Sequence, residues 1–215
     1  MEYALEGCLR KNLRVISQMD WRDKLNLLQC IAYDLMIMHS QDLIHRDLHS
    51  GNILLNSLKS AHIADLGLSI TANIALKSNS DGIYGILPYI APEVLNKHPY
   101  TKESDIYSFG IIMWEIFYGR PVPFEQNSEL QFQLQVCNGL RPQIYENTAI
   151  CYSDLMEKCW SMDLKKRPTS KDIYDTFVEW QNNESNYRSS FISFNSSYKY
   201  QGSKLRELGI PEILN

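Results

Sequence analysis

The stretch that decides the fold is residues 44–54, with the sequence Ile-His-Arg-Asp-Leu-His-Ser-Gly-Asn-Ile-Leu. In this stretch Asp47 is followed five residues later by Asn52. A tight loop with this spacing can hold a carboxylate that accepts the proton of a hydroxyl, beside an amide oxygen that binds a divalent cation. Taken alone, the two residues would also fit an ordinary turn, because Asp and Asn favour turns.

Five further motifs follow this stretch in order. Asp65-Leu66-Gly67 comes thirteen residues after Asn52, directly after the apolar run 61–64. A carboxylate at the end of a strand, followed by a glycine turn, is well placed to bind a Mg²⁺ ion that bridges phosphate groups. The other four motifs are Ala91-Pro92-Glu93, Asp105-Ile106-Tyr107-Ser108-Phe109-Gly110, Cys159-Trp160 and Arg167-Pro168-Thr169.

In this order and at these distances, the segments resemble the eukaryotic protein kinase family. An HRD-x₄-N loop, a DLG variant of the DFG metal-binding motif and an APE motif all match the kinase signature set. The resemblance covers about residues 1–181. It implies a mainly α fold, the large C-terminal lobe of a kinase with a few short β-hairpin strands, which starts at the hinge with the small lobe absent.

The resemblance also implies roles for single residues of the catalytic loop. Asp47 resembles the catalytic base, and Asn52 resembles the second metal ligand. Asp65 resembles the carboxylate that holds Mg²⁺ on the phosphates of ATP. Arg46 resembles the arginine that pairs with an activation-loop phosphate. His45 resembles the histidine that supports the DLG turn.

The first residues resemble the kinase hinge, which binds the adenine of ATP. Met1 stands at the gatekeeper position. Glu2 and Ala4 are expected to contact adenine, with Ala4 offering main-chain hydrogen bonds. Leu54 matches the apolar floor beneath adenine. A partner or a missing small lobe is expected to cover this hinge face, since an exposed apolar patch is a liability.

Three more positions resemble the framework of the kinase large lobe. Glu93 and Arg167 match the buried ion pair that anchors the end of the activation segment, and Asp105 matches the aspartate that holds the catalytic-loop backbone. Candidate phosphorylation sites in the activation segment are Ser78, Ser80 and Tyr84, because an exposed loop presents their hydroxyl groups.

The sequence also departs from the family pattern. No G-x-G-x-x-G occurs in it, and neither the strand lysine nor its partner glutamate can be placed. The chain is therefore expected to be a protein kinase that is truncated, and weak or inactive by itself. A lobe-only pseudokinase that binds or regulates partners is the alternative. A small-molecule phosphotransferase with a D-x-H-x-x-N loop is disfavoured by Glu93, Asp105 and Arg167.

Substrate class rests on the residues around the activation segment. His49 stands where Ser/Thr kinases carry Lys and tyrosine kinases carry Ala or Arg, and Ile86 replaces the usual Thr. Leu87-Pro88-Tyr89 and the motif that begins at Asp105 resemble the tyrosine-kinase-like group of Ser/Thr kinases. The prediction is a protein substrate phosphorylated on Ser or Thr, with Tyr kept open. No metal role is expected for His49 or His62.

Periodicity and turn residues predict the remaining elements. Residues 1–12 are expected to be extended, with a turn at Gly7, and 65–93 to be a long surface loop. A polar tail, 182–215, is expected to be mostly disordered, with a short helix at 204–208. Helices are predicted at 21–39 with Asp20 as N-cap, 104–118, 128–138, 150–160 and 170–181, and strands at 42–44, 52–55 and 61–64.

Composition narrows the setting. Apolar residues make up 44% of the chain, the net charge is −4, and no long basic block occurs, which argues against nucleic acid as a partner. No apolar run is long enough for a membrane span, and no signal peptide is visible. Five irregularly spaced cysteines favour free thiols. The expected location is cytoplasmic.

Overall fold

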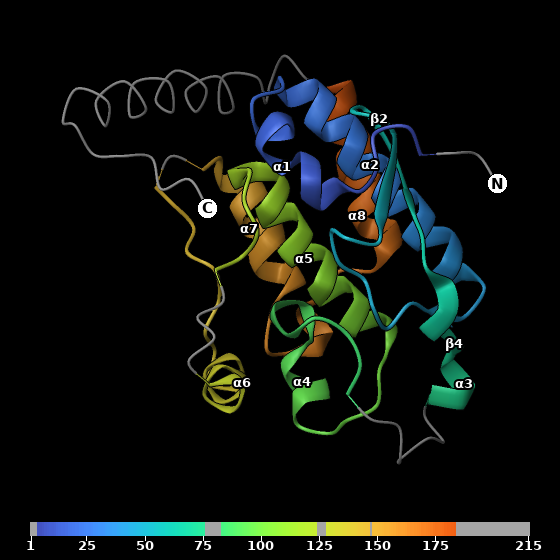
Figure 1. Cartoon of the computed structure of the whole chain (residues 1–215), viewed down its shortest axis with the longest axis vertical. Helices are drawn as coiled ribbons and strands as arrows, with labels where there is room; N and C mark the ends of the chain where they lie inside the picture. Colours follow the sequence, from blue (N-terminus) through green and yellow to red (C-terminus); the bar gives the residue numbers. More distant parts are fainter. Residues whose placement is uncertain (1–3, 76–82, 124–127, 147, 184–215) are drawn as a thin grey trace.

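The fold is a helical body, seen in a computed structural model that describes residues 4–75, 83–123, 128–146 and 148–183 (Figure 1). The helices are α1 (Leu9–Ser17), α2 (Trp21–Ser40), α3 (Ala72–Ala75), α4 (Pro92–Leu95), α5 (Lys102–Tyr118), α6 (Glu129–Cys137), α7 (Ile150–Cys159) and α8 (Ser170–Asn182). Four short strands, β1 (Leu43–Ile44), β2 (Ile53–Ser57), β3 (Ser60–Ile63) and β4 (Ile70–Thr71), complete the described part together with single turns of 3₁₀ helix.

Helix α5 forms the centre of the body, and every residue of it from Ser104 to Tyr118 is buried. At its start the Ser104 hydroxyl accepts the Thr101 main-chain N–H at 3.1 Å. Gly119, with φ 71°, ends the helix in the left-handed conformation that glycine adopts without strain. α1 and α7 pack against α5, and α8 lies along α2. The buried helix predicted at 104–118 is confirmed.

Helix α2 shows why the predicted helices form where they do. Asp20 caps it, accepting a hydrogen bond from the Asp23 amide at 2.9 Å. Leu28, Ile31 and Leu35 recur at helical spacing and are fully buried. The helices predicted near 128–138, 150–160 and 170–181 correspond to α6, α7 and α8.

The first twelve residues contain the main error of the sequence prediction. Gly7 does occupy a turn, with φ 71°, but the chain after Cys8 is helical rather than extended. In α1, the buried residues Leu9, Leu13 and Ile16 lie on one helical face. The N-cap position is Cys8, which makes no side-chain capping bond, so the usual signal for a helix start is missing.

Two small antiparallel sheets flank the predicted site. β2 and β3 form a hairpin, with Ile53 opposite Ile63. β1 pairs with β4, so Ile44 lies opposite Ile70. The prediction of one continuous loop at 65–93 is wrong, because this stretch contains β4, α3 and the start of α4.

None of the described helices combines the length and the apolar character needed to cross a bilayer. α8 ends at Asn182, and the predicted tail beyond residue 183, including the short helix at 204–208, lies outside the described residues.

Candidate active site

Asp105, near the start of α5, holds the loop that contains Asp47. We call residues 45–52 the Asp47 loop. The Asp105 carboxylate accepts hydrogen bonds from the main-chain N–H groups of His45 at 2.8 Å and Arg46 at 3.0 Å. The Oδ2 atom that accepts the His45 N–H also lies 3.0 Å from Nε2 of the His39 ring. Asp105 is only 1% exposed, so these contacts satisfy a buried carboxylate, as predicted from the resemblance.

Arg46 has a positive φ of 73°, which is uncommon for a residue with a side chain. Such a conformation persists only when its surroundings enforce it. The bond from the Arg46 amide to Asp105 provides part of that enforcement. The Arg46 guanidinium lies 4.8 Å from the ring centre of Tyr84 and 5.1 Å from that of Tyr100.

His45 connects the Asp47 loop to the DLG turn, residues 65–67. Its Nδ1 accepts the Asp47 main-chain N–H at 3.2 Å, so the ring proton is on Nε2. That Nε2 can then donate to the carbonyl of Ala64, 3.0 Å away. The histidine therefore links the backbone at Asp47 to the residue before Asp65, which is the supporting position predicted for it.

Asp47 and Asn52 lie together within the loop. The Asn52 side-chain N–H₂ donates to the Asp47 carbonyl at 3.0 Å and to Asp47 Oδ2 at 3.2 Å. This leaves the amide oxygen of Asn52 as the end that can bind a cation. Asp47 Oδ1 is buried and has no hydrogen-bond partner among the described residues.

The environment of Asp47 keeps its carboxyl ionised. Burial pushes the pKa of Asp47 up, but His49, Asn52 and His45 together hold that pKa below its ordinary value. His49 Nε2 lies 3.5 Å from Asp47 Oδ1, which is longer than an ordinary hydrogen bond. The ionised carboxylate can accept a hydrogen bond from a substrate hydroxyl.

His49 was not predicted to contact Asp47, although its ring is held in a defined place. Nδ1 of His49 accepts the Gly51 amide at 3.0 Å, which leaves Nε2 as the protonated nitrogen of the neutral ring. A Cβ at position 51 would lie 2.8 Å from this ring, so glycine is needed there. A histidine followed two residues later by glycine is the only sequence signal for this arrangement.

Asp65 begins the DLG turn in the left-handed conformation, with φ 60°. Its Oδ1 accepts the Gly67 amide at 3.3 Å, and its side chain is exposed. The neighbouring Ala64 amide donates to the Asn52 carbonyl at 2.8 Å, so the backbones at Asn52 and Asp65 lie side by side. One amide oxygen and one carboxylate fit Mg²⁺, which takes few protein ligands and completes its shell with phosphate and water oxygens.

Only part of the predicted hinge lies within the residues that the structure describes. Met1 and Glu2 lie outside the described residues, as do the candidate phosphorylation sites Ser78 and Ser80. The Ala4 carbonyl accepts the Gly7 amide at 3.2 Å, in the turn before α1. Leu54 is half-buried in β2, opposite His62 and bridged to Cys8. Adenine contacts by Glu2, Ala4 and Leu54 stay a prediction.

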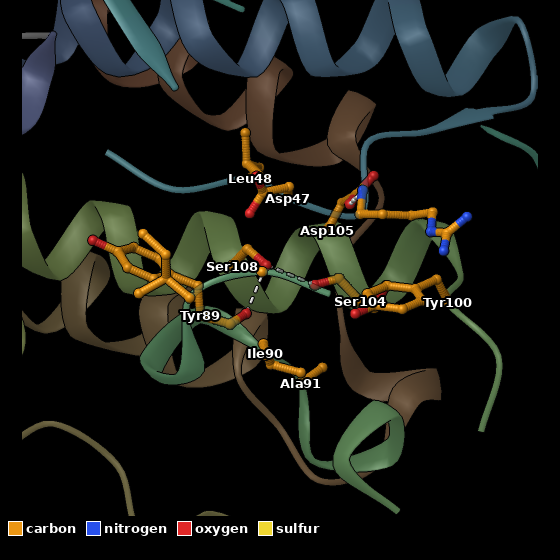
Figure 2. A pocket seen from close by; sticks show the side chains of 12 residues that line it. Asp47, Leu48, Tyr89, Ile90, Ala91, Tyr100, Ser104, Asp105 and Ser108 are labelled. Carbon is orange, nitrogen blue, oxygen red and sulfur yellow. Dashed lines mark hydrogen bonds between the residues drawn. The ribbon is translucent and has the colours of Figure 1, made fainter. Parts of the chain in front are cut away.

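The activation segment, residues 65–93, returns to the Asp47 loop at Gly85. Gly85 has φ 105°, and a Cβ there would lie 3.3 Å from Asp47 Oδ1. A small pocket lies beside this contact, lined by residues of the loop, the activation segment and the start of α5 (Figure 2). Within it, the Ser108 hydroxyl donates to the Tyr89 carbonyl at 2.8 Å.

Behind this pocket Tyr89 joins the segment to α5 through a buried polar chain. Its hydroxyl donates to Glu115 Oε1 at 2.6 Å and lies 2.9 Å from the Ser50 hydroxyl. Burial raises the pKa of the Glu115 carboxyl and the pKa of Tyr89. The Val122 amide gives Glu115 Oε1 a second donor at 3.1 Å. This network ties the Asp47 loop, the activation segment and α5 together.

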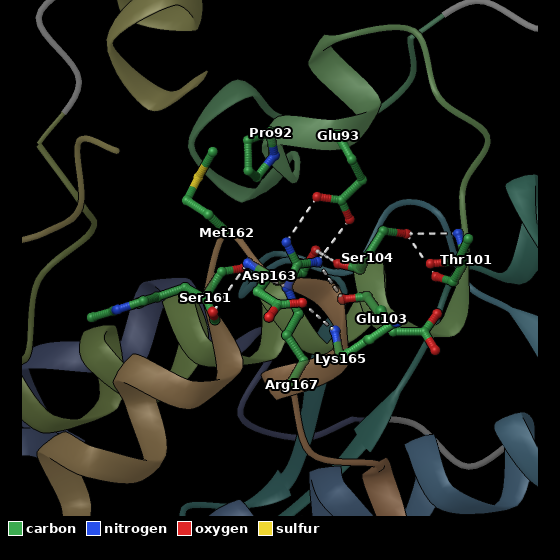
Figure 3. Close-up of polar contacts among 12 residues, drawn as sticks. Pro92, Glu93, Thr101, Glu103, Ser104, Ser161, Met162, Asp163, Lys165 and Arg167 are labelled. Atoms are coloured by element: carbon green, nitrogen blue, oxygen red, sulfur yellow. Dashed lines mark hydrogen bonds and ion pairs between the residues drawn. The ribbon is translucent and has the colours of Figure 1, made fainter. Parts of the chain in front are cut away.

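The end of the activation segment is anchored by Glu93 and Arg167, which face each other in Figure 3. Arg167 donates to both carboxylate oxygens of Glu93, at 2.7 and 2.8 Å. It also donates to the carbonyls of Glu103 at 2.8 Å and Ser161 at 2.9 Å. The Arg167 side chain is fully buried, so the predicted ion pair is confirmed.

The sequence also matches a known protein family and several of its members. The family model described as protein tyrosine and serine/threonine kinase matches residues 1–177. A serine/threonine-protein kinase of Dictyostelium discoideum named roco5 is 34% identical over 197 residues, with 83% of this chain and 7% of the relative covered. The serine/threonine-protein kinase STY46 of Arabidopsis thaliana is 32% identical over 151 residues, with 69% of this chain and 26% of the relative covered.

A third relative, named as a serine/threonine-protein kinase of Dictyostelium discoideum, is 36% identical over 155 residues, or 63% of this chain and 9% of the relative. The chain thus spans about a tenth of the length of the first relatives it matches. The family model covers most of the chain. This chain belongs to the protein kinase family.

Proposed function

We propose that this chain supplies the large lobe of a protein kinase that transfers the γ-phosphoryl group of ATP to a hydroxyl of a protein substrate. One observation carries the proposal. Asp47 is ionised and held from two sides by Asn52 and His45, and its buried Oδ1 has no hydrogen-bond partner among the described residues. An ionised carboxylate can accept the hydrogen bond of a substrate hydroxyl and orient it.

In the proposed reaction, Asp47 Oδ1 accepts the hydrogen bond of the substrate hydroxyl and orients its oxygen toward the γ-phosphorus. The new O–P bond forms as the bond to the β-phosphate oxygen breaks, ADP leaves, and the hydroxyl proton passes to Asp47. The chain contributes mainly position and charge, because phosphoryl transfer needs little covalent help from the protein.

Mg²⁺, when bound, would neutralise charge that develops on the phosphate oxygens. The amide oxygen of Asn52 and the carboxylate of Asp65 are the residues that would hold it. The backbone contact between Ala64 and Asn52 supports their action as one site. The base and the metal ligands would then lie on two segments that His45 keeps in register.

Serine and threonine are the favoured acceptors, with tyrosine as the alternative. The names of the relatives and the likeness of Leu87-Pro88-Tyr89 to the tyrosine-kinase-like group support this choice. All five cysteines are free thiols. Such a pattern suits a reducing compartment, and we propose that the protein acts in the cytoplasm.

We further propose that phosphoryl transfer by this chain alone is slow. Its sequence has no G-x-G-x-x-G to cover the phosphates. The same observation favours one alternative function, a pseudokinase lobe that binds partners without turnover. Thermal unfolding of the chain with increasing Mg-ATP separates the two, because a ligand that binds the folded state raises its stability. No shift at millimolar Mg-ATP would favour the pseudokinase lobe.

The catalytic proposal is tested by γ-phosphoryl transfer to a generic protein substrate, measured for the chain and for the chain joined to a kinase small lobe. Asp47→Asn should abolish transfer without loss of fold. Asp154→Asn, an exposed residue of α7, is the matched control and should behave as wild type. Full transfer by the Asp47→Asn protein would refute the role of Asp47.

A further inference from the structure

Arg46 lies against two aromatic rings that come from different segments. Its guanidinium is 4.8 Å from the ring centre of Tyr84, in the activation segment, and 5.1 Å from that of Tyr100, just before α5. Both distances are within the range of cation–π attraction. The two tyrosines therefore contact the side chain of the residue that directly precedes Asp47.

The two tyrosines are also joined to each other, through a single hydroxyl. The Tyr100 hydroxyl accepts the Tyr84 main-chain N–H at 2.8 Å and donates to the Tyr84 carbonyl at 2.5 Å. One side-chain group thus satisfies both polar groups of one residue, as a neighbouring strand would. Desolvation raises the pKa of Tyr100, so the hydroxyl keeps the proton that it donates.

Tyr100 has a rigid base from which to hold Tyr84. The next residue, Thr101, is the N-cap of the buried helix α5, and its amide is bonded to the Ser104 hydroxyl at 3.1 Å. The residue after Tyr84 is Gly85, whose backbone lies against the carboxylate of Asp47. Tyr100 and Asp47 line the same pocket, as Figure 2 shows.

These contacts stabilise the unusual backbone conformation of Arg46. Asp105 holds the Arg46 amide and the two rings contact its guanidinium, so both ends of this residue, whose φ is 73°, have fixed partners. A shift of Tyr84 would release one ring and move Gly85 away from Asp47. The Tyr100 hydroxyl is the group that fixes Tyr84.

We propose that Tyr100 is a positioning residue for the proposed phosphoryl transfer. Through the main chain of Tyr84 it clamps the side chain of Arg46, and so fixes both the direction of Asp47 and the return of the activation segment at Gly85. The catalytic consequence rests on the proposed function, whereas the clamp is a property of the folded chain. The contacts that form the clamp are hydrogen bonds and cation–π contacts.

The test uses the full chain labelled with ¹⁵N, and compares Tyr100→Phe with wild type. The Phe variant keeps the ring over Arg46 and loses only the hydroxyl. The Tyr84 amide should exchange with solvent about tenfold faster or more, since its acceptor is gone. The amide signals of Gly85, Arg46 and Asp47 should shift, while signals of α2 and α8 stay in place.

Tyr33→Phe is the matched control, because Tyr33 is a half-exposed tyrosine on α2 that contacts the ring of Tyr174. It should leave all four amide signals unchanged. Unaltered exchange at Tyr84 in the Tyr100→Phe protein would overturn the clamp. Faster exchange at Tyr84 with unchanged Arg46 and Asp47 signals would overturn the positioning role. Neither readout needs ATP or turnover, so the proposal and the proposed function can fail separately.

Discussion

The ion pair between Glu93 and Arg167 yields the sharpest prediction about stability. Arg167→Met keeps most of the volume of the side chain and removes its charge and donors. The carboxylate of Glu93, which is 10% exposed, then loses both of its bonds to Arg167. The carbonyls of Glu103 and Ser161 also lose a donor each.

The expected cost can be estimated from these contacts. Removing one partner of a buried ion pair costs about 3–5 kcal/mol, because the remaining charge is left without compensation. Two further carbonyls lose charge-assisted donors, worth about 1–3 kcal/mol each, but the terms overlap. We therefore expect the free energy of unfolding to fall by about 4 kcal/mol, a large fraction of the ~5–15 kcal/mol typical of a domain.

Urea denaturation followed by circular dichroism measures this loss. The double variant Glu93→Gln/Arg167→Met should be more stable than the sum of the two single changes predicts, since the buried charges are removed together. Lys171→Ala breaks an exposed pair with Asp175 and serves as the control, with no measurable change expected. A loss below about 1 kcal/mol for Arg167→Met would refute the reasoning, because it would make this pair equivalent to a surface salt bridge.

Three further changes test other parts of the structure. Lys24 is 3% exposed, and desolvation lowers its pKa to about 8, so the folded state disfavours its charged form. Between pH 8 and 10.5 the unfolded chain binds more protons than the folded chain, so the free energy of unfolding should rise with pH in that window. At pH 7 the free energy of unfolding of Lys24→Met should exceed that of wild type by up to about 3 kcal/mol. Equal urea midpoints for both proteins at pH 7 and pH 10 would contradict this. Gly110→Ala places a Cβ 2.8 Å from the Cβ of Cys159, and should lower the free energy of unfolding, measured by thermal unfolding, by about 1–3 kcal/mol. An unchanged unfolding midpoint would show that α5 and α7 can separate freely. Asp105→Asn replaces the carboxylate that accepts two buried N–H groups. It should lower the free energy of unfolding by about 2 kcal/mol and shift the amide signals of His45 and Arg46. Unshifted signals would contradict the anchoring role of Asp105.

Long-range anchors were predictable where the sequence carried a motif. Asp105, Glu93 and Arg167 were placed correctly because each stands in a segment with its own signature. His39 carried no such signal. It reaches Asp105 across 66 positions of the chain, and only the packing of α2 beside α5 brings the two side chains together.

Local structure was harder to predict where the usual end signals are missing. The helix α1 has Leu9, Leu13 and Ile16 at helical spacing, but neither a capping side chain nor an acidic first turn. The short elements inside 65–93 depend on pairing with distant strands, as when Ile70 of β4 meets Ile44 of β1. Such pairing is a tertiary effect that periodicity does not report.

The contacts of Arg46 show a third limit. Its pairing with an activation-loop phosphate stays a prediction, and the sequence analysis considered Tyr84 only as a site of modification. In the structure the ring of Tyr84 lies over Arg46, and its main chain is held by Tyr100. Nothing in the spacing of these three residues indicates that their side chains meet.

The central claim is that Asp47, Asn52 and Asp65 serve one nucleotide-bound metal ion. Mn²⁺, which replaces Mg²⁺ and broadens NMR signals of nearby nuclei, tests it directly when added with ATP to the ¹⁵N-labelled chain. We expect the side-chain amide of Asn52 and the main-chain amides of Asp47 and Asp65 to broaden together, and Asp65→Asn to abolish the effect while Asp154→Asn preserves it. Broadening at only one of the three positions, or at a separate part of the surface, would contradict the account.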